Sequence, residues 1–155
     1  MDEKKITKSI TVNGDAGYVY SLWENFETFP TFMENIESVQ DMGNGLTHWV
    51  MEGPLGIRLE WDAETTTKEP NKRIGWNSKD HDADVKTSGQ VVFADLGNGK
   101  TEVTATVRYE PNKAGLAGDV VARLFGQPEA RLETDLRNFK DFAEGRVDRL
   151  TGQES

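Results

Sequence analysis

Residues 20–33, with the sequence YSLWENFETFPTFM, hold five of the fourteen aromatic residues of this chain. The segment is typical of two short helical pieces that break before Pro30, because the residue ahead of a proline disfavours helical dihedral angles. Side chains this bulky must be buried, yet so broken a segment cannot form a core alone. We therefore expect it to act as a plug or wall against a curved surface, which the strands that follow would provide.

Seven segments alternate apolar and polar residues with the period of two that is typical of half-buried strands. They lie near residues 4–12, 36–42, 46–52, 56–66, 72–78, 85–95 and 101–110. Tight turns are expected between them at Asn44-Gly45, Asn98-Gly99, Gly53-Pro54 and Pro70-Asn71. This pattern predicts an antiparallel meander with one dry face and one wet face.

Two short helices are expected between the first two strands. Asp15 is suited to cap a helix that carries Val19, Leu22 and Trp23. A second short helix is expected near residues 28–33.

The predicted fold class is therefore α+β. The length of 155 residues fits a single domain, with an ordered core at about 4–144 and a polar tail at 145–155.

The last third of the chain is predicted to be helical, with an interruption at Gly126-Gln127-Pro128. Residues 114–125 carry apolar side chains at helical spacing, and Pro128 suits the first turn of a new helix. The apolar face of that helix comprises Leu132, Leu136, Phe139, Phe142 and Ala143. Glu133 and Arg137 are placed for an i,i+4 pair. The interruption suggests that 114–125 acts as a lid; hydrogen exchange as slow there as at 130–142 would contradict this.

The dry face of the predicted sheet mixes small and large residues. Ala63, Thr87, Gly89 and Ala105 are small, whereas the large side chains are Trp61, Trp76, Phe93 and Tyr109. A curved sheet with large residues at its rim and small ones on its floor encloses a cavity beneath a helix. The alternative is a solid core in which the aromatic rings interdigitate with the helix.

Several segments resemble bacterial polyketide cyclase/dehydrase-like proteins of the START-like (SRPBCC, Bet v 1-like) superfamily. They are Trp23-Glu-Asn-Phe26-Glu-Thr-Phe29-Pro30-Thr-Phe32-Met33, Thr47-His48-Trp49-Val50, Gly53-Pro54-Leu55-Gly56, Glu60-Trp61-Asp62-Ala63-Glu64, Arg73-Ile74-Gly75-Trp76, Leu124-Phe125-Gly126 and Asp135-Leu136-Arg137-Asn138-Phe139-Lys140. The resemblance covers about residues 4–144. It implies the helix-grip fold, a seven-stranded curved sheet around a long C-terminal helix. Members bind lipids, isoprenoid quinones, hormones or aromatic polyketides between sheet and helix, and a few catalyse ring closure or dehydration.

Pattern and resemblance together predict a set of residues around the cavity: Phe29, Phe32, Met33, Leu59, Trp61, Trp76, Thr87, Phe93, Tyr109, Leu116, Val120, Leu132 and Leu136. Trp23 is expected mainly in the core, with Phe29, Phe32 and Met33 nearer the opening. Polar groups that could face the ligand are few, namely Ser78, Thr87, Tyr109 and Arg123. Tyr109 is either a donor to a ligand oxygen or a rim residue with its hydroxyl in water. No cofactor is expected.

Candidate catalytic and metal-binding groups are sparse. His48 and His81 are the only histidines and there is no cysteine, so a zinc site of the usual kind is not expected. His48 is either a surface histidine or a proton donor at the pocket mouth. The acidic run at 80–84 lacks the glycine and glutamate that a calcium loop needs. Glu60, Asp62 and Glu64 share the wet face, which favours a role in solubility over catalysis.

The charge of the chain limits its partners. Eighteen basic and twenty-seven acidic residues give a net charge of −9, which disfavours nucleic acid and anionic lipid surfaces. The first residues lack the apolar run of a signal peptide, and no segment is suited to span a membrane. Together with the lack of cysteine, this predicts a cytoplasmic protein. The sequence leaves the oligomeric state open between a monomer and a weak dimer.

Three functions follow as hypotheses. The first is a protein that binds or carries a small apolar ligand, such as a polyketide, a fatty acyl group or an isoprenoid quinone. The second is an enzyme of the aromatase/cyclase or dehydratase type; binding is favoured over it because no nucleophile is paired with a base. The third is a protein-interaction module that uses helix 114–144 or an edge strand.

Overall fold

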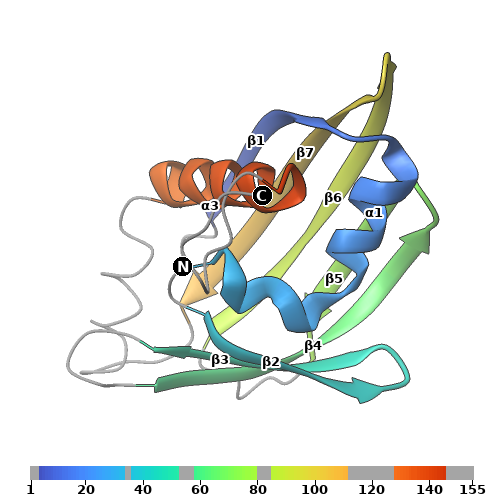
Figure 1. The fold of residues 1–155 in the computed structure, drawn as a ribbon. Helices are drawn as coiled ribbons and strands as arrows, with labels where there is room; N and C mark the ends of the chain where they lie inside the picture. Colours follow the sequence, from blue (N-terminus) through green and yellow to red (C-terminus); the bar gives the residue numbers. More distant parts are fainter. Residues whose placement is uncertain (1–3, 34–35, 53–57, 80–84, 112–127, 146–155) are drawn as a thin grey trace.

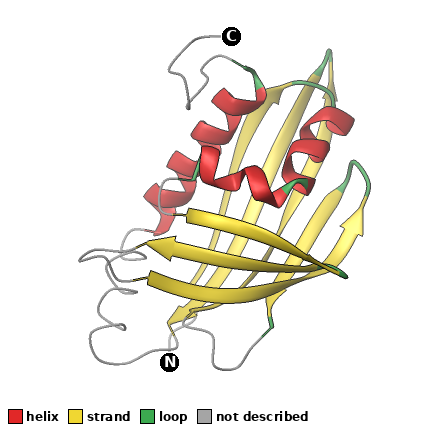
Figure 2. Cartoon of the chain, turned by 60° about the horizontal axis from the view of Figure 1, so that its bottom comes forward, coloured by secondary structure: helices red, strands yellow, loops and turns green. Residues whose placement is uncertain are grey.

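The computed structural model describes residues 4–33, 36–52, 58–79, 85–111 and 128–145. They form one seven-stranded antiparallel sheet with the strand order β1-β7-β6-β5-β4-β3-β2. The helices lie together on one side of this curved sheet (Figures 1 and 2). The strands are β1 (Lys4–Asn13), β2 (Ile36–Gly43), β3 (Leu46–Glu52), β4 (Arg58–Glu69), β5 (Arg73–Ser78), β6 (Val85–Gly97) and β7 (Lys100–Pro111). The predicted α+β helix-grip architecture is confirmed.

Three of the predicted turns are built on asparagine in the left-handed conformation. Asn44, Asn71 and Asn98 have φ values of 56°, 63° and 57°, and glycine follows the first and third of them. Asparagine and glycine tolerate this region, in which other side chains are strained, and such turns match the twist of paired strands. These residues therefore set where β2, β4 and β6 end.

Two short helices connect β1 to β2. Helix α1 (Ala16–Glu24) begins after Asp15, whose carboxylate accepts a hydrogen bond from the Tyr18 backbone N–H at 2.8 Å. The next element, η1 (Phe26–Thr31), is a 3₁₀ helix that begins two residues earlier than predicted. Pro30 lies within it and cannot donate a backbone hydrogen bond, so a continuous α-helix is not formed there.

Helix α3 (Pro128–Ala143) begins at the predicted proline and packs beside β1. Lys8 of β1 forms ion pairs with Glu129 and Glu133 at 3.5 and 3.4 Å. At the other end, Lys140 donates to the Thr11 carbonyl oxygen at 2.9 Å. These contacts fix α3 across the sheet. The lid predicted at residues 114–125 lies outside the described residues.

An aromatic cluster joins α3 to the two short helices. The Phe139 side chain is 0% exposed, and its ring centroid lies 5.0 Å from that of Trp23 and 5.3 Å from that of Phe32. Phe32 also contacts Phe142. The aromatic segment at 20–33 therefore packs between the sheet and α3, as expected of a plug. None of the described helices is both long enough and apolar enough to cross a bilayer.

Candidate ligand cavity

A cavity of about 170 Å³ lies between the concave face of the sheet, the short helices and α3. Most of its walls are apolar. The apolar side chains come from every described helix and strand: Ile6, Trp23, Phe26, Phe29, Met33, Ile36, Trp49, Met51, Trp61, Ala63, Ile74, Trp76, Val91, Ala105, Val107 and Leu132. Small residues on the floor, such as Ala63 and Ala105, leave the space that the large rings surround. The sequence left open a cavity beneath the helix or a solid core of interdigitated rings, and the structure contains the cavity.

One wall of the cavity is aromatic. The rings of Trp49 and Trp61, which are opposite each other on β3 and β4, are stacked with their centroids 6.1 Å apart and their planes within 6°. Phe29 of η1 meets Trp49 edge to face at 5.5 Å. This wall presents ring faces and ring edges to the cavity.

Trp76 reaches the wall because its neighbour is a glycine. Gly89 of β6 lies opposite Trp76 of β5 in the strand register. A Cβ atom at position 89 would lie 2.8 Å from Cζ2 of Trp76 and would also collide with the Thr106 carbonyl oxygen. The indole therefore lies against the bare backbone of β6, where any other residue at position 89 would displace it.

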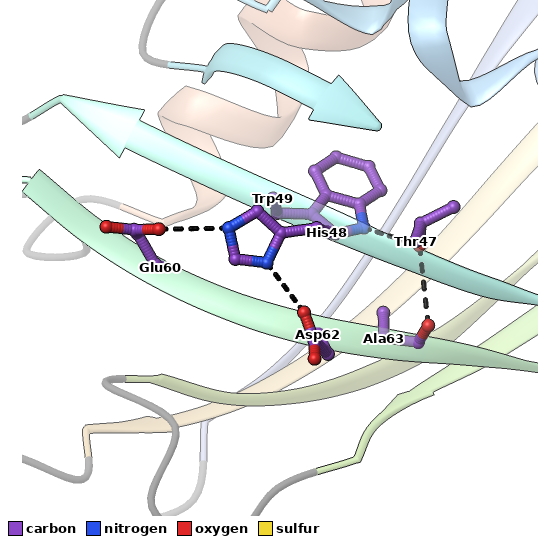
Figure 3. A network of polar contacts seen from close by, with 6 residues as sticks. All are labelled: Thr47, His48, Trp49, Glu60, Asp62 and Ala63. Carbon is purple, nitrogen blue, oxygen red and sulfur yellow. Dashed lines mark hydrogen bonds and ion pairs between the residues drawn. The ribbon is translucent and has the colours of Figure 1, made fainter. Parts of the chain in front are cut away.

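The polar part of the lining is small. It comprises the side chains of Thr47, Thr65, Thr87, Arg131 and Asp135. The Thr47 hydroxyl accepts a hydrogen bond from the Trp49 indole at 2.8 Å and donates to the Ala63 carbonyl oxygen at 3.4 Å (Figure 3). Arg131 and Asp135 are one helical turn apart on α3 and supply the ionisable groups of the described lining.

His48 lies outside the cavity. The alternation of β3 places it on the outer face of the sheet, where its Nδ1 is 2.6 Å from Asp62 and its Nε2 is 2.9 Å from Glu60 (Figure 3). Hydrogen bonds to Asp62 and then Glu60 raise the pKa of His48 above its ordinary value. It is therefore a surface histidine held by two carboxylates, and the proposed role as proton donor to a ligand has no support in this geometry.

The His48 contacts predict a pH-dependent contribution to stability. Because the folded-state pKa is raised, the contribution is fully present below the unfolded pKa of about 6.5 and is lost as pH rises through the folded value. His48→Gln should lower the unfolding free energy at pH 5.5 by less than about 1 kcal/mol, since these groups are partly exposed. Urea denaturation of both proteins at several pH values checks this. A deficit that grows toward alkaline pH would contradict it.

The structure places the predicted cavity residues in three groups. Phe29, Met33, Trp61, Trp76, Thr87 and Leu132 line the cavity. Phe32, Leu59, Phe93 and Leu136 do not line it and are buried beside it. Strand alternation identified the inner face but not how far the cavity extends along it, since Phe93 packs on Tyr20 of α1. Phe32, which directly follows η1, packs on Phe139. The Tyr109 side chain, Leu116 and Val120 lie outside the described residues, as do Arg123 and the loop at 80–84. That the lining residues bind a ligand stays a prediction.

Some residues that line the cavity were not among those predicted from the sequence. Thr47, Trp49 and Met51 alternate on β3, and this pattern was sufficient to find them. Arg131 and Asp135 flank the apolar stripe of α3, and only the rotation of that helix over the sheet decides that they line the cavity. Among the described residues, no three His, Asp or Glu side chains are grouped to hold a metal ion.

Comparison with known proteins places this fold in a family. The family model "Polyketide cyclase / dehydrase and lipid transport" matches residues 12–137. The chain belongs to this family. An uncharacterised 17.2 kDa protein of Streptomyces lincolnensis is 32% identical to this family member over 142 residues, which cover 92% of this chain and 91% of that protein.

Two solved structures show the same fold. An aromatase/cyclase from a Streptomyces species has a TM-score of 0.74 at 17% identity, covering 98% of this chain and all of that one. A START superfamily protein from Mycobacterium smegmatis has a TM-score of 0.71 at 18% identity, covering 90% of this chain and 97% of that one. The family membership supports a role in ligand binding or polyketide processing without separating the two.

Proposed function

We propose that this family member binds a small, mainly apolar ligand of one or two rings in the cavity between the sheet and α3. The observation that carries the proposal is the 170 Å³ cavity, walled by stacked and edge-on aromatic rings. An apolar protein cavity of about 150 Å³ is known to take up benzene, so this volume accommodates a ring or the ring end of a larger molecule. Of the candidate ligand classes, an aromatic polyketide or quinone ring fits this wall better than a flexible fatty acyl chain.

Affinity would come mainly from apolar burial, at about 25 cal/mol per Å² less the cost of immobilising the ligand. The few polar groups would set its orientation. The Thr47 hydroxyl already has two partners, so it contributes mainly by holding Trp49 in place. Small bicyclic compounds such as 1-tetralone and tetralin are suitable probes because each combines one aromatic ring with one saturated ring.

A cavity-filling variant tests this proposal. Ala105 is on the cavity floor, whereas Ala94 is exposed on the outer face of the sheet. Ala105→Leu should weaken 1-tetralone binding about tenfold, equivalent to about 1.4 kcal/mol, and Ala94→Leu should leave it unchanged. Isothermal titration calorimetry measures both, with thermal unfolding to verify the fold of each variant. Equal binding by the two variants, or none by the parent protein, would refute the proposed site.

A cyclase or dehydratase is the second candidate. It is favoured by the presence of Arg131 and Asp135, two ionisable groups in an otherwise apolar lining. A dehydratase needs a base to take a proton from the carbon beside a carbonyl, and an acid to protonate the hydroxyl on the next carbon so that it leaves as water. Incubation with a β-hydroxy aryl ketone followed by mass spectrometry separates the candidates. Loss of one water indicates catalysis, whereas unchanged ketone together with calorimetric binding of the same compound indicates binding alone.

A further inference from the structure

The indole N–H of Trp23 is a buried donor that meets no acceptor in the part of the chain that the structure describes. The Trp23 side chain is 4% exposed, and its Nε1 has no hydrogen-bond partner among the described residues. Trp23 lines the cavity. Trp49 lines it too, but its Nε1 donates to the Thr47 hydroxyl at 2.8 Å. Of these two indoles on the same cavity, only that of Trp49 finds a hydrogen-bond acceptor within the described ranges.

The packed neighbours of Trp23 cannot supply the acceptor. The ring centroid of Trp23 lies 5.1 Å from that of Phe29, 6.2 Å from that of Phe32 and 5.0 Å from that of Phe139. These phenyl rings have no oxygen or nitrogen atom that could accept the hydrogen bond. A buried donor without a partner is destabilising, and phenylalanine would fill much of the same apolar space without that penalty. The cavity is where an acceptor can approach Trp23 without displacing a packed side chain.

We propose that Trp23 Nε1 donates a hydrogen bond to a carbonyl oxygen of the bound ligand, so that the cavity selects aryl ketones or quinones over hydrocarbons of the same shape. This inference rests on the proposed function and adds the polar contact that orients the ligand. Tyr20 also has a buried hydroxyl without a partner among the described residues, but it does not line the cavity, so the argument does not extend to it.

Two matched probes and two matched variants test the proposal. 1-Tetralone carries a carbonyl that tetralin lacks, and Trp→Phe removes the indole donor while keeping an aromatic ring. The parent protein should bind 1-tetralone about three- to tenfold more tightly than tetralin, the range expected for one hydrogen bond. Trp23→Phe should abolish this preference, whereas Trp49→Phe should change the affinity for both probes alike. Calorimetric titration of the three proteins gives the ratios.

A second measurement uses the parent protein alone, so its result does not depend on whether a variant folds. In ¹H–¹⁵N spectra of the parent protein, the Trp23 indole proton should shift downfield with 1-tetralone and not with tetralin. If both probes bind with equal affinity and this proton does not shift, the Trp23 contact is refuted while the binding function stands. If neither probe binds, the proposed function fails and this inference fails with it.

Discussion

Gly89→Ala is expected to lower the free energy of unfolding by about 3 kcal/mol, the upper end of the usual cost of overpacking a core. The added Cβ would meet the Thr106 carbonyl oxygen, which belongs to a paired strand and cannot move without breaking the sheet. It would also lie 2.8 Å from Trp76, whose indole would have to leave its place on the cavity wall. Urea denaturation measures the loss of stability. Titration of the folded Gly89→Ala protein with 1-tetralone should also show weaker binding than the parent protein.

Gly17 provides the matched control. It lies in the first turn of α1, and a Cβ there would meet nothing closer than 3.5 Å. Alanine is favoured over glycine in a helix, so Gly17→Ala should raise the free energy of unfolding by about 0.5 kcal/mol. Equal changes in the free energy of unfolding for Gly89→Ala and Gly17→Ala would contradict the close approach of Trp76 to β6.

Phe139→Ala is expected to be more damaging, with a loss of about 4 kcal/mol in the free energy of unfolding. The ring has no exposed surface and contacts Trp23 and Phe32, so its removal leaves a cavity that these rings cannot fill. A domain of this size has only about 5–15 kcal/mol of stability, and the variant should therefore lose a large part of it. Chemical denaturation at 25 °C measures the loss.

Leu96→Ala is the control for this truncation. Leu96 is 51% exposed near the end of β6, so removing it should change the free energy of unfolding by about 0.5 kcal/mol or less. A comparable loss in the two variants would mean that Phe139 is not the contact that holds α3 to the plug.

The strand pattern was predictable because the period of two is a local property. Alternation gave the seven strands to within a few residues, and the Asn44 and Asn98 turns gave the pairing of their neighbours. The start of α3 was also predictable, because the preference of proline for the first turn of a helix is a local property too. The 3₁₀ character of η1 was not predicted, because it depends on how Phe29 and Phe32 pack against Trp23 as well as on Pro30.

The cavity could be predicted only in outline. The sizes of Ala63, Ala105 and Trp61 on one face of the sheet indicated a hollow, and all three line it. Which inner-face residues lie beside the hollow rather than along it depends on long-range packing, as Phe93 illustrates by meeting Tyr20. Arg131 depends likewise on the rotation of α3, which no local pattern determines.

Intermolecular NOEs test the binding site most directly. In isotope-filtered spectra of ¹³C-labelled protein with unlabelled 1-tetralone, the account predicts NOEs from the ligand to methyl groups of Ile74, Val91 and Ala105 on the cavity floor. NOEs confined to outer-face residues such as Thr7 and Thr106, or bound ligand with no NOE to the methyl groups of these three cavity residues, would contradict it.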